Sequence, residues 1–201
     1  MTVEAAAAPG GGTVQVVEAK ASWPAEFTAI AAALRRALGE TALRIDHVGS
    51  TAVPGLAGKD RIDVQVSVRS LGGRDVSDAI TSLGYRAFDG IQRDHRPAGA
   101  VGPDADWQKR FFTSQPGERG VNIHVRESGR ANERYALLFR DYLRAHPNAA
   151  SAYAELKRRL AVELRDPRVY PDVKDPACDL IAVAAEDWAE QTDWTPGRSD
   201  A

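Results

Sequence analysis

A strictly alternating run at residues 61–68 constrains the fold of this chain more than any other feature of its sequence. Successive side chains of a strand point to opposite faces of a sheet. One face of this run would carry Ile62, Val64, Val66 and Val68, and the other Asp63, Gln65 and Ser67. The run therefore predicts a strand with one face buried in an apolar core and the other face polar.

The segments around this strand indicate a mixed α/β fold. Further strands are predicted at residues 43–48, 107–113 and 120–126, the last two joined by a turn rich in Pro and Gly. Helical patterns cover residues 23–38, 75–83, 132–145, 147–164 and 175–190. We therefore expect an α/β (α+β) fold, in which a mixed sheet is flanked by helices and the C-terminal third is helical.

The length of 201 residues fits one domain, which we place at residues 14–190. Residues 1–13 and 192–201 are predicted to be flexible termini. The opening segment lacks the basic start and apolar centre of a signal peptide.

Composition narrows the partners that we expect. The net charge is −2 with no basic tract, which indicates no nucleic-acid partner. No stretch approaches the roughly 18 apolar residues that cross a bilayer, so no membrane association is expected. The single cysteine, Cys178, cannot form an internal disulfide, and we interpret it as a small buried apolar residue in a cytoplasmic protein.

A Gly-Ser pair directly after the strand at residues 43–48 indicates a phosphate site. Glycine lets the backbone approach a ligand closely, and hydroxyl groups beside the amides of a helix start can hold phosphate oxygens. A nearby lysine can act as a point charge, and an arginine on the later hairpin can clamp a phosphate. The predicted phosphate- or nucleotide-binding residues are Gly49, Ser50, Thr51, Lys59 and Arg110.

Polar side chains also alternate along the strand at residues 120–126. If this strand shares a sheet with residues 61–68, the two polar faces coincide, and they either face water or line a cleft. The cleft would bring together Asp63, Gln65, Ser67, Asn122, His124 and Arg126.

Within such a cleft Asp63 and His124 are the predicted catalytic residues. The Asp63 carboxylate can hold Mg²⁺ or Mn²⁺ against a triphosphate, and His124 can act as a general base. Other cleft residues are His47, Gln65, Asn122, Tyr153 and Lys157. The alternatives are a plain turn with a solvated aspartate, a structural His47, a solvated Lys59, an Arg110 paired with an acid, and a surface pair at Tyr153 and Lys157.

The segment HVGSTAVPGLAGKDRIDVQVSV, residues 47–68, resembles the motif of the GrpB family. Its matching positions are His47, Gly49, Ser50, Thr51, Val53, Pro54, Gly55, Leu56, Lys59, Ile62 and Asp63. Similar stretches include Trp23-Pro24, Lys109-Arg110-Phe111, Asn122-Ile123-His124-Val125, Phe139-Arg140-Asp141-Tyr142-Leu143, His146-Pro147 and Tyr153-x-x-Leu156-Lys157. The resemblance covers residues 14–190.

This resemblance implies a nucleotidyltransferase-like fold, in a domain that also occurs fused to dephospho-CoA kinase. Active nucleotidyltransferases pair two carboxylates as Asp-apolar-Asp/Glu and place a third on a later strand. Here Gln65 occupies the second position, and Asn122 or His124 the third. Because Mg²⁺ prefers hard oxygen ligands, this departure predicts binding of a nucleotide or phosphorylated small molecule more firmly than nucleotidyl transfer.

Three hypotheses follow: a metal-dependent nucleotidyltransferase, a binding module without turnover, and a structural or folding-accessory domain. The first requires a second carboxylate within ~4 Å of Asp63, for which Asp46 and Glu127 are the candidates. The first two both require that the cleft at Asp63 is not filled by side chains.

Overall fold

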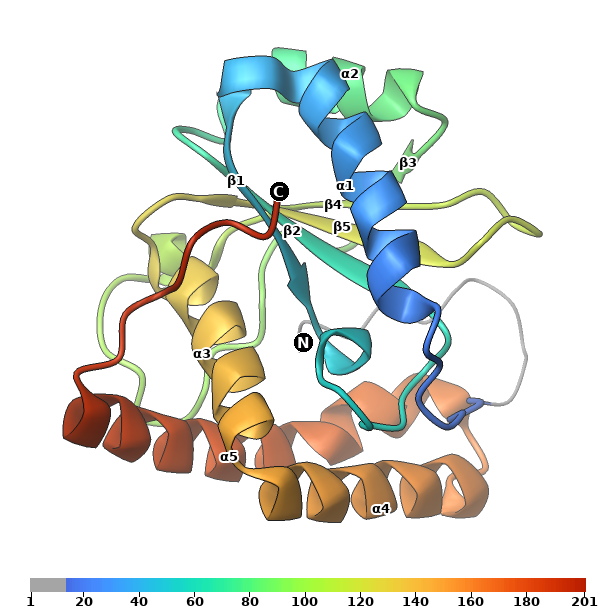
Figure 1. The fold of residues 1–201 in the computed structure, drawn as a ribbon, viewed down its shortest axis with the longest axis vertical. Coiled ribbons are helices and arrows are strands. Elements are labelled where there is room, and N and C mark those ends of the chain that lie inside the picture. Colours follow the sequence, from blue (N-terminus) through green and yellow to red (C-terminus); the bar gives the residue numbers. More distant parts are fainter. Residues whose placement is uncertain (1–13) are drawn as a thin grey trace.

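A computed structural model describes residues 14–201, which form a five-stranded sheet with helices on both of its faces (Figure 1). The sheet order is β1-β2-β5-β4-β3, and only β2 and β5 are parallel neighbours. The strands are β1 (Ala42–Val48), β2 (Ile62–Val68), β3 (Arg86–Ala87), β4 (Arg110–Thr113) and β5 (Val121–Glu127). This mixed sheet confirms the predicted fold class.

Two helices, α1 (Trp23–Leu38) and α2 (Asp75–Ser82), cover the apolar face of the sheet. The main core forms there, from the apolar side of α1 and alternate residues of β2 and β5. Burial of these side chains removes apolar surface from water, which is the main force that holds the layers together.

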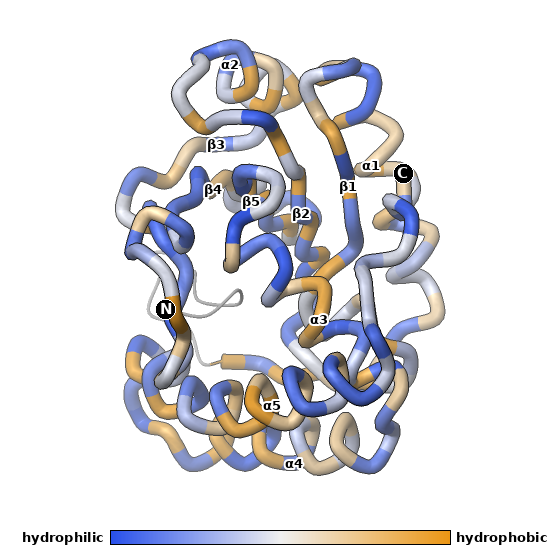
Figure 2. Tube along the Cα trace, turned by 90° about the vertical axis from the view of Figure 1, so that its left-hand side faces the viewer, coloured by the Kyte–Doolittle hydropathy of each residue, from blue (hydrophilic) through white to orange (hydrophobic). Residues whose placement is uncertain are grey.

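The helical C-terminal third lies on the other side of the sheet. It consists of α3 (Ala131–Ala145), α4 (Pro147–Glu163) and α5 (Tyr170–Thr192). In Figures 1 and 2, α4 and α5 lie together at one end of the molecule, whereas α2 and β3 lie at the opposite end. Among the helices in the described part of the chain, none has both the length and the apolar character needed to cross a bilayer.

Two boundaries differ from those predicted by the sequence pattern. The strand expected at residues 107–113 begins only at Arg110, because residues 104–107 form a short 3₁₀ helix. The last helix begins at Tyr170 rather than at residue 175, with Pro171 in its first turn. Pro171 is suited to that position because its missing N–H group would have no partner in a first turn.

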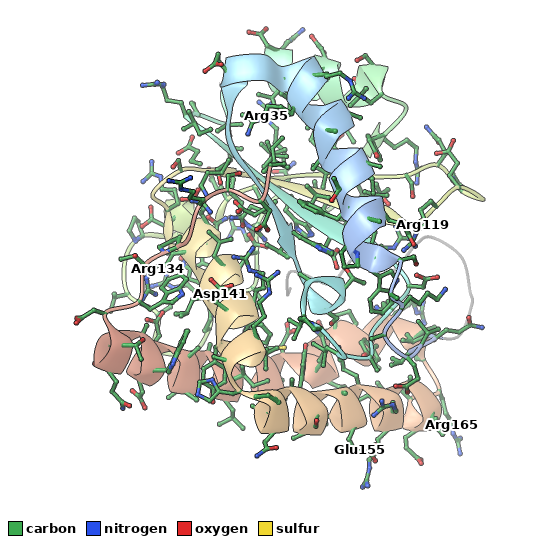
Figure 3. The ribbon with its side chains drawn as sticks, viewed as in Figure 1. Arg35, Arg119, Arg134, Asp141, Glu155 and Arg165 are labelled. Carbon is green, nitrogen blue, oxygen red and sulfur yellow. The ribbon has the colours of Figure 1, made fainter. Side chains whose placement is uncertain are left out.

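The C-terminal residues pack along the outer edge of β1, where the sequence indicated a flexible tail. Ser199 Oγ accepts from the amide of Ile45 at 2.8 Å, and an Asp200 carboxylate oxygen accepts from the amide of His47 at 2.9 Å. Arg35 of α1, labelled in Figure 3, donates to the backbone oxygen of Ala201 at 2.8 Å. The predicted flexible N-terminal arm, residues 1–13, lies outside the described residues.

Candidate functional site

The polar faces of β2 and β5 coincide. Asp63 is the register partner of Asn122, and Gln65 that of His124. Asn122 Nδ2 donates to Asp63 Oδ1 at 2.7 Å, and His124 Nε2 lies 3.6 Å from the same oxygen. All of these side chains are buried. The predicted catalytic pair is therefore adjacent, within the interior of the protein.

His124 is held in one tautomer by a neighbour that the sequence analysis did not select. Lys109 Nζ lies 3.2 Å from His124 Nδ1 and donates to Asp94 Oδ1 at 2.7 Å. An ammonium group has only donors, so Nδ1 must accept and Nε2 carries the proton that faces Asp63. Burial, together with the positive charges of Lys109 and Arg126, lowers the pKa of His124 well below its usual value. The Nε2–H group thus points toward Asp63 from 3.6 Å, beyond hydrogen-bond distance, and an imidazole with so low a pKa is a poor general base.

Side chains fill the rest of the polar face around His124. Arg126 donates through Nε and Nη2 to Asp94 at 2.8 and 2.9 Å, and through Nη1 to Gln65 at 2.5 Å. Asn132 of α3 donates to the same Asp94 carboxylate at 3.0 Å. Burial raises the pKa of Asp94, but the charges of Arg126 and Lys109 outweigh it and hold that pKa far below its ordinary value. The expected open cleft is therefore a packed, charge-balanced layer at this point, and neither nucleotidyl transfer nor ligand binding is supported at the β2–β5 face itself.

The donor set does not fit a two-metal centre. Asp46 is held by Arg44 at 3.0 and 2.9 Å, and Glu127 accepts from the Leu71 amide at 2.9 Å. Within residues 14–201, no group of three or more His, Cys, Asp or Glu side chains is arranged to hold a metal ion. Asp63 accepts from the Asn122 amide and has the cationic side chains of Arg61 and Lys109 nearby, whereas Mg²⁺ needs several hard oxygen ligands.

A second cluster, which we call the lysine pocket, lies beside the Gly-Ser turn. It consists of Ser50, Lys59, Lys157 and Lys174, with the rings of Tyr153 and Tyr170. Lys157 Nζ of α4 donates to Ser50 Oγ at 2.6 Å and lies 4.6 Å from the centre of the Tyr153 ring. Lys174 Nζ of α5 lies 3.3 Å from the Tyr153 hydroxyl oxygen. Lys157 is 0% exposed and Lys174 1%.

Lys59 completes this cluster from the loop before β2, where its Nζ lies 4.6 Å from the centre of the Tyr170 ring. Three ammonium groups from three segments thus lie against tyrosines of the helical third, Lys59 against Tyr170 and both Lys157 and Lys174 against Tyr153. The sequence analysis selected Lys59, Lys157 and Tyr153, and the structure places all of them here. It missed Lys174, which lies one residue before the predicted start of the last helix.

A cavity of about 40 Å³ opens beside the lysine pocket. Its walls are mostly apolar, and they include Gly49, Ser50, Leu56, Tyr135, Phe139, Tyr153, Lys174 and Cys178. Asp63 and His124 are not among the lining residues. The Cys178 thiol is buried, as expected, with Sγ 3.3 Å from the Tyr153 hydroxyl oxygen and 3.6 Å from Lys174 Nζ.

Two glycines allow the close packing at this point. A Cβ atom on Gly49, whose φ is +70°, would lie 2.5 Å from Asp63 Oδ2. A Cβ atom on Gly58 would lie 2.6 Å from Ser50 Cβ and 3.5 Å from Lys157 Nζ. These positions therefore exclude side chains, which keeps the Gly-Ser turn against β2 on one side and against α4 on the other.

Three predicted site residues lie elsewhere. His47 stacks on Phe27 of α1, with ring centres 4.6 Å apart, and its Nε2 lies 2.9 Å from Thr51 Oγ1. Burial and the nearby charge of Arg144 lower the pKa of His47 to about 4. Arg110 Nη1 donates to Gly73 and Ser77 on the α2 side of the sheet. The side chains of His47, Thr51 and Arg110 are thus directed to the face opposite Asp63.

Comparison with known proteins places this architecture in a family. Residues 13–183 match the family described as GrpB protein, and the chain belongs to the GrpB family. A crystal structure of the conserved protein GrpB from Enterococcus faecalis superposes with a TM-score of 0.67 at 27% identity, covering 87% of this chain and 99% of that one.

A curated relative named dephospho-CoA kinase, from Mycolicibacterium paratuberculosis, is 37% identical over 199 residues. The match covers 91% of this chain and 48% of the relative, so the chain spans about half the length of that protein. A remote likeness, with a TM-score of 0.46 at 13% identity, is to Cid1 in complex with its short product ApU. It covers 71% of this chain and 42% of Cid1, and it carries no argument about chemistry.

Proposed function

We propose that this protein binds a phosphorylated small molecule in the lysine pocket and does not use two-metal chemistry. The observation that carries the proposal is the contact of 2.6 Å between Lys157 Nζ and Ser50 Oγ, in which both residues are buried. It joins the Gly-Ser turn to the helical third at the point where the ammonium groups converge.

The electrostatics of the lysine pocket favour an anion. Ammonium groups in low-dielectric surroundings create a strong positive potential, because little water is present to screen them. A phosphate group can accept hydrogen bonds from lysine side chains and from the Ser50 hydroxyl.

Binding is favoured over nucleotidyl transfer because of the surroundings of Asp63. Transfer through two metals needs paired carboxylates, and Asp63 has Asn122 and His124 as its neighbours. The charge-balanced pair of Asp94 and Lys109 lies on the far side of His124. We therefore propose that the lysine pocket binds phosphate and does not stabilise a metal-bound transition state.

The chemistry of a coenzyme A precursor suits the pocket. Such molecules carry phosphate groups, which the ammonium groups of the lysine pocket would bind. A relative that includes a similar domain is named dephospho-CoA kinase, which makes these precursors the first ligands to test. With its one cysteine, the protein is proposed to bind them in the cytoplasm.

A thermal-shift titration with 4′-phosphopantetheine, which has no nucleoside, tests this function, with EDTA or with Mg²⁺ or Mn²⁺. A ligand at 100 times its Kd stabilises the folded state by about 2.7 kcal/mol. We expect this shift in EDTA for the wild type, for Asp63→Asn and for Arg159→Met, a control at an exposed position of α4. Lys157→Met should abolish this ligand-induced shift, and the wild-type protein should not transfer label from NTP to any product. A shift that needs metal and Asp63, or that survives Lys157→Met, contradicts the proposal.

A further inference from the structure

A groove lies between α2 and β4, on the side of the sheet that faces α2. It encloses about 520 Å³, and its walls come from the start of α2, from residues 87–93 and from β4. It lies at the end of the molecule that holds α2 and β3, whereas the lysine pocket lies beside α4 and α5 (Figure 2). The two sites are therefore separate.

The groove exists because the chain bulges away from β4. Ala87 pairs with Phe112, and Arg93 pairs with Gln108, so the seven residues 87–93 on one side are opposite the five residues 108–112 on the other. Backbone hydrogen bonds at 2.9 Å close both ends of this bulge, from Phe88 to Phe111 and from Lys109 to Gln92. Bulges of this kind redirect side chains and often lie next to binding sites.

Three arginines line the groove. Arg110 is held in place by donating through Nη1 to Gly73 at 2.6 Å and to Ser77 at 2.8 Å, so its Nε and Nη2 groups remain available. Arg74 and Arg93 are exposed, and their side chains form no hydrogen bond or ion pair with any residue in the described range 14–201. Asp89 is the one acidic side chain among the lining residues. The groove thus carries an excess of positive charge.

An aromatic side chain completes this site. Phe88 is half-buried, lines the groove and packs edge-on against Phe111, with ring centres 6.3 Å apart and ring planes at 88°. Such a fixed ring offers an apolar surface to a planar heterocycle, since base–aromatic stacking contributes favourably without sequence preference.

We propose that this groove is a second binding site, which accepts a nucleoside polyphosphate. Its volume falls within the range of small-molecule pockets, roughly 300–1,000 Å³. Guanidinium groups recognise phosphate oxygens bidentately, and three of them match a chain of phosphates rather than a single monoanion. Phe88 supplies the contact for the base. Arg110, selected from the sequence as a phosphate ligand, therefore acts in this groove and not beside Ser50.

Calorimetric titration of ATP into the full chain in EDTA tests the proposal. The background is Lys157→Met, so that the lysine pocket does not contribute. Arg74→Gln with Arg93→Gln should weaken ATP binding by about tenfold or more, since each lost charge-assisted bond costs about 1.5–3 kcal/mol. Arg36→Gln, an exposed arginine of α1, is the matched control and should leave Kd within about twofold. Equal affinities in the double variant and the control would overturn the proposal.

Two further probes define the ligand class. Inorganic tripolyphosphate should bind through the same arginines, and Phe88→Leu should weaken ATP but not tripolyphosphate. A ten-nucleotide oligoadenylate that binds more tightly than ATP, with the same dependence on Arg74 and Arg93, would overturn the proposal in favour of a nucleic-acid surface. If ATP still binds in the Lys157→Met background, the groove binds it independently of the lysine pocket. A failure of one proposal can then be distinguished from a failure of the other.

Discussion

Lys157 Nζ donates to Ser50 Oγ at 2.6 Å although the two residues lie 107 positions apart in the chain. The contact connects the turn after β1 with α4, so it forms only when the helical third has packed against the sheet. A ligand held at this point would contact both parts of the fold at once. The predictions below test this pocket, the buried layer next to it and the edges of the sheet.

Gly58→Ala should destabilise the protein by about 1–3 kcal/mol, the usual cost of overpacking. The added Cβ would lie 2.6 Å from Ser50 Cβ, which is bonded directly to the backbone and cannot swing away. Urea denaturation measures the change. Gly73→Ala is the matched control, because its Cβ would meet nothing within 4 Å, and it should be neutral or slightly stabilising. An unchanged Gly58→Ala would show that the turn is not tightly packed.

His124 should remain neutral, with its proton on Nε2, from pH 8 down to pH 5.5. The pKa of His124 lies well below 6.5 because the ring is buried beside Lys109 and Arg126. Nitrogen-15 NMR of the imidazole ring distinguishes the two tautomers and the imidazolium. Lys109→Met removes the donor to Nδ1 and should relax the tautomer preference. A spectrum of imidazolium or of the Nδ1-protonated form at pH 7 would refute this assignment.

His47 should make stability depend on pH between about 4 and 6.5. Its pKa is lowered to about 4 in the folded state, so the unfolded chain binds more protons in this window. The contribution of His47 is fully present above pH 6.5 and decreases as the pH falls, with a loss of about 2 kcal/mol at pH 5. His47→Gln should flatten this part of the stability profile, and equal profiles for the two proteins would contradict the prediction.

Removal of residues 197–201 should expose the outer edge of β1. The amides of Ile45 and His47 donate to Ser199 and Asp200, and these partners would be lost. Hydrogen exchange at both amides should become faster, while the amides of β2 in the sheet interior keep their protection relative to global unfolding. Unchanged exchange at Ile45 and His47 would mean that the C-terminal residues do not protect this edge.

Alternation along two strands was sufficient to predict that Asp63 and His124 share one face of the sheet. The register of β2 and β5 then follows from burial of the opposite, apolar face, because a slip of one residue would reverse every side chain. Local pattern could not show that Asp94 enters this layer, since it comes from an irregular segment and meets Lys109 only in the folded chain.

The separation of Arg110 from the Gly-Ser turn and from His124 has a similarly local cause. Adjacent strand residues face opposite sides, so Lys109 and Arg110 cannot both reach His124. Phe111 packs against His124 with ring centres 5.0 Å apart, which assigns the odd-numbered positions to that face. Lys174 was missed for another reason. Prolines and aspartates between residues 166 and 176 interrupt the helical pattern, so the helix was predicted to begin at residue 175 rather than at Tyr170.

Both outer strands of the sheet are protected from pairing with another chain. The C-terminal residues cover β1, and β3 spans only Arg86–Ala87. Unprotected strand margins recruit other polypeptides and nucleate amyloid-like aggregates. At high concentration the intact chain should therefore stay dispersed, and its colloidal behaviour should depend on a handful of residues that contribute little to the hydrophobic core.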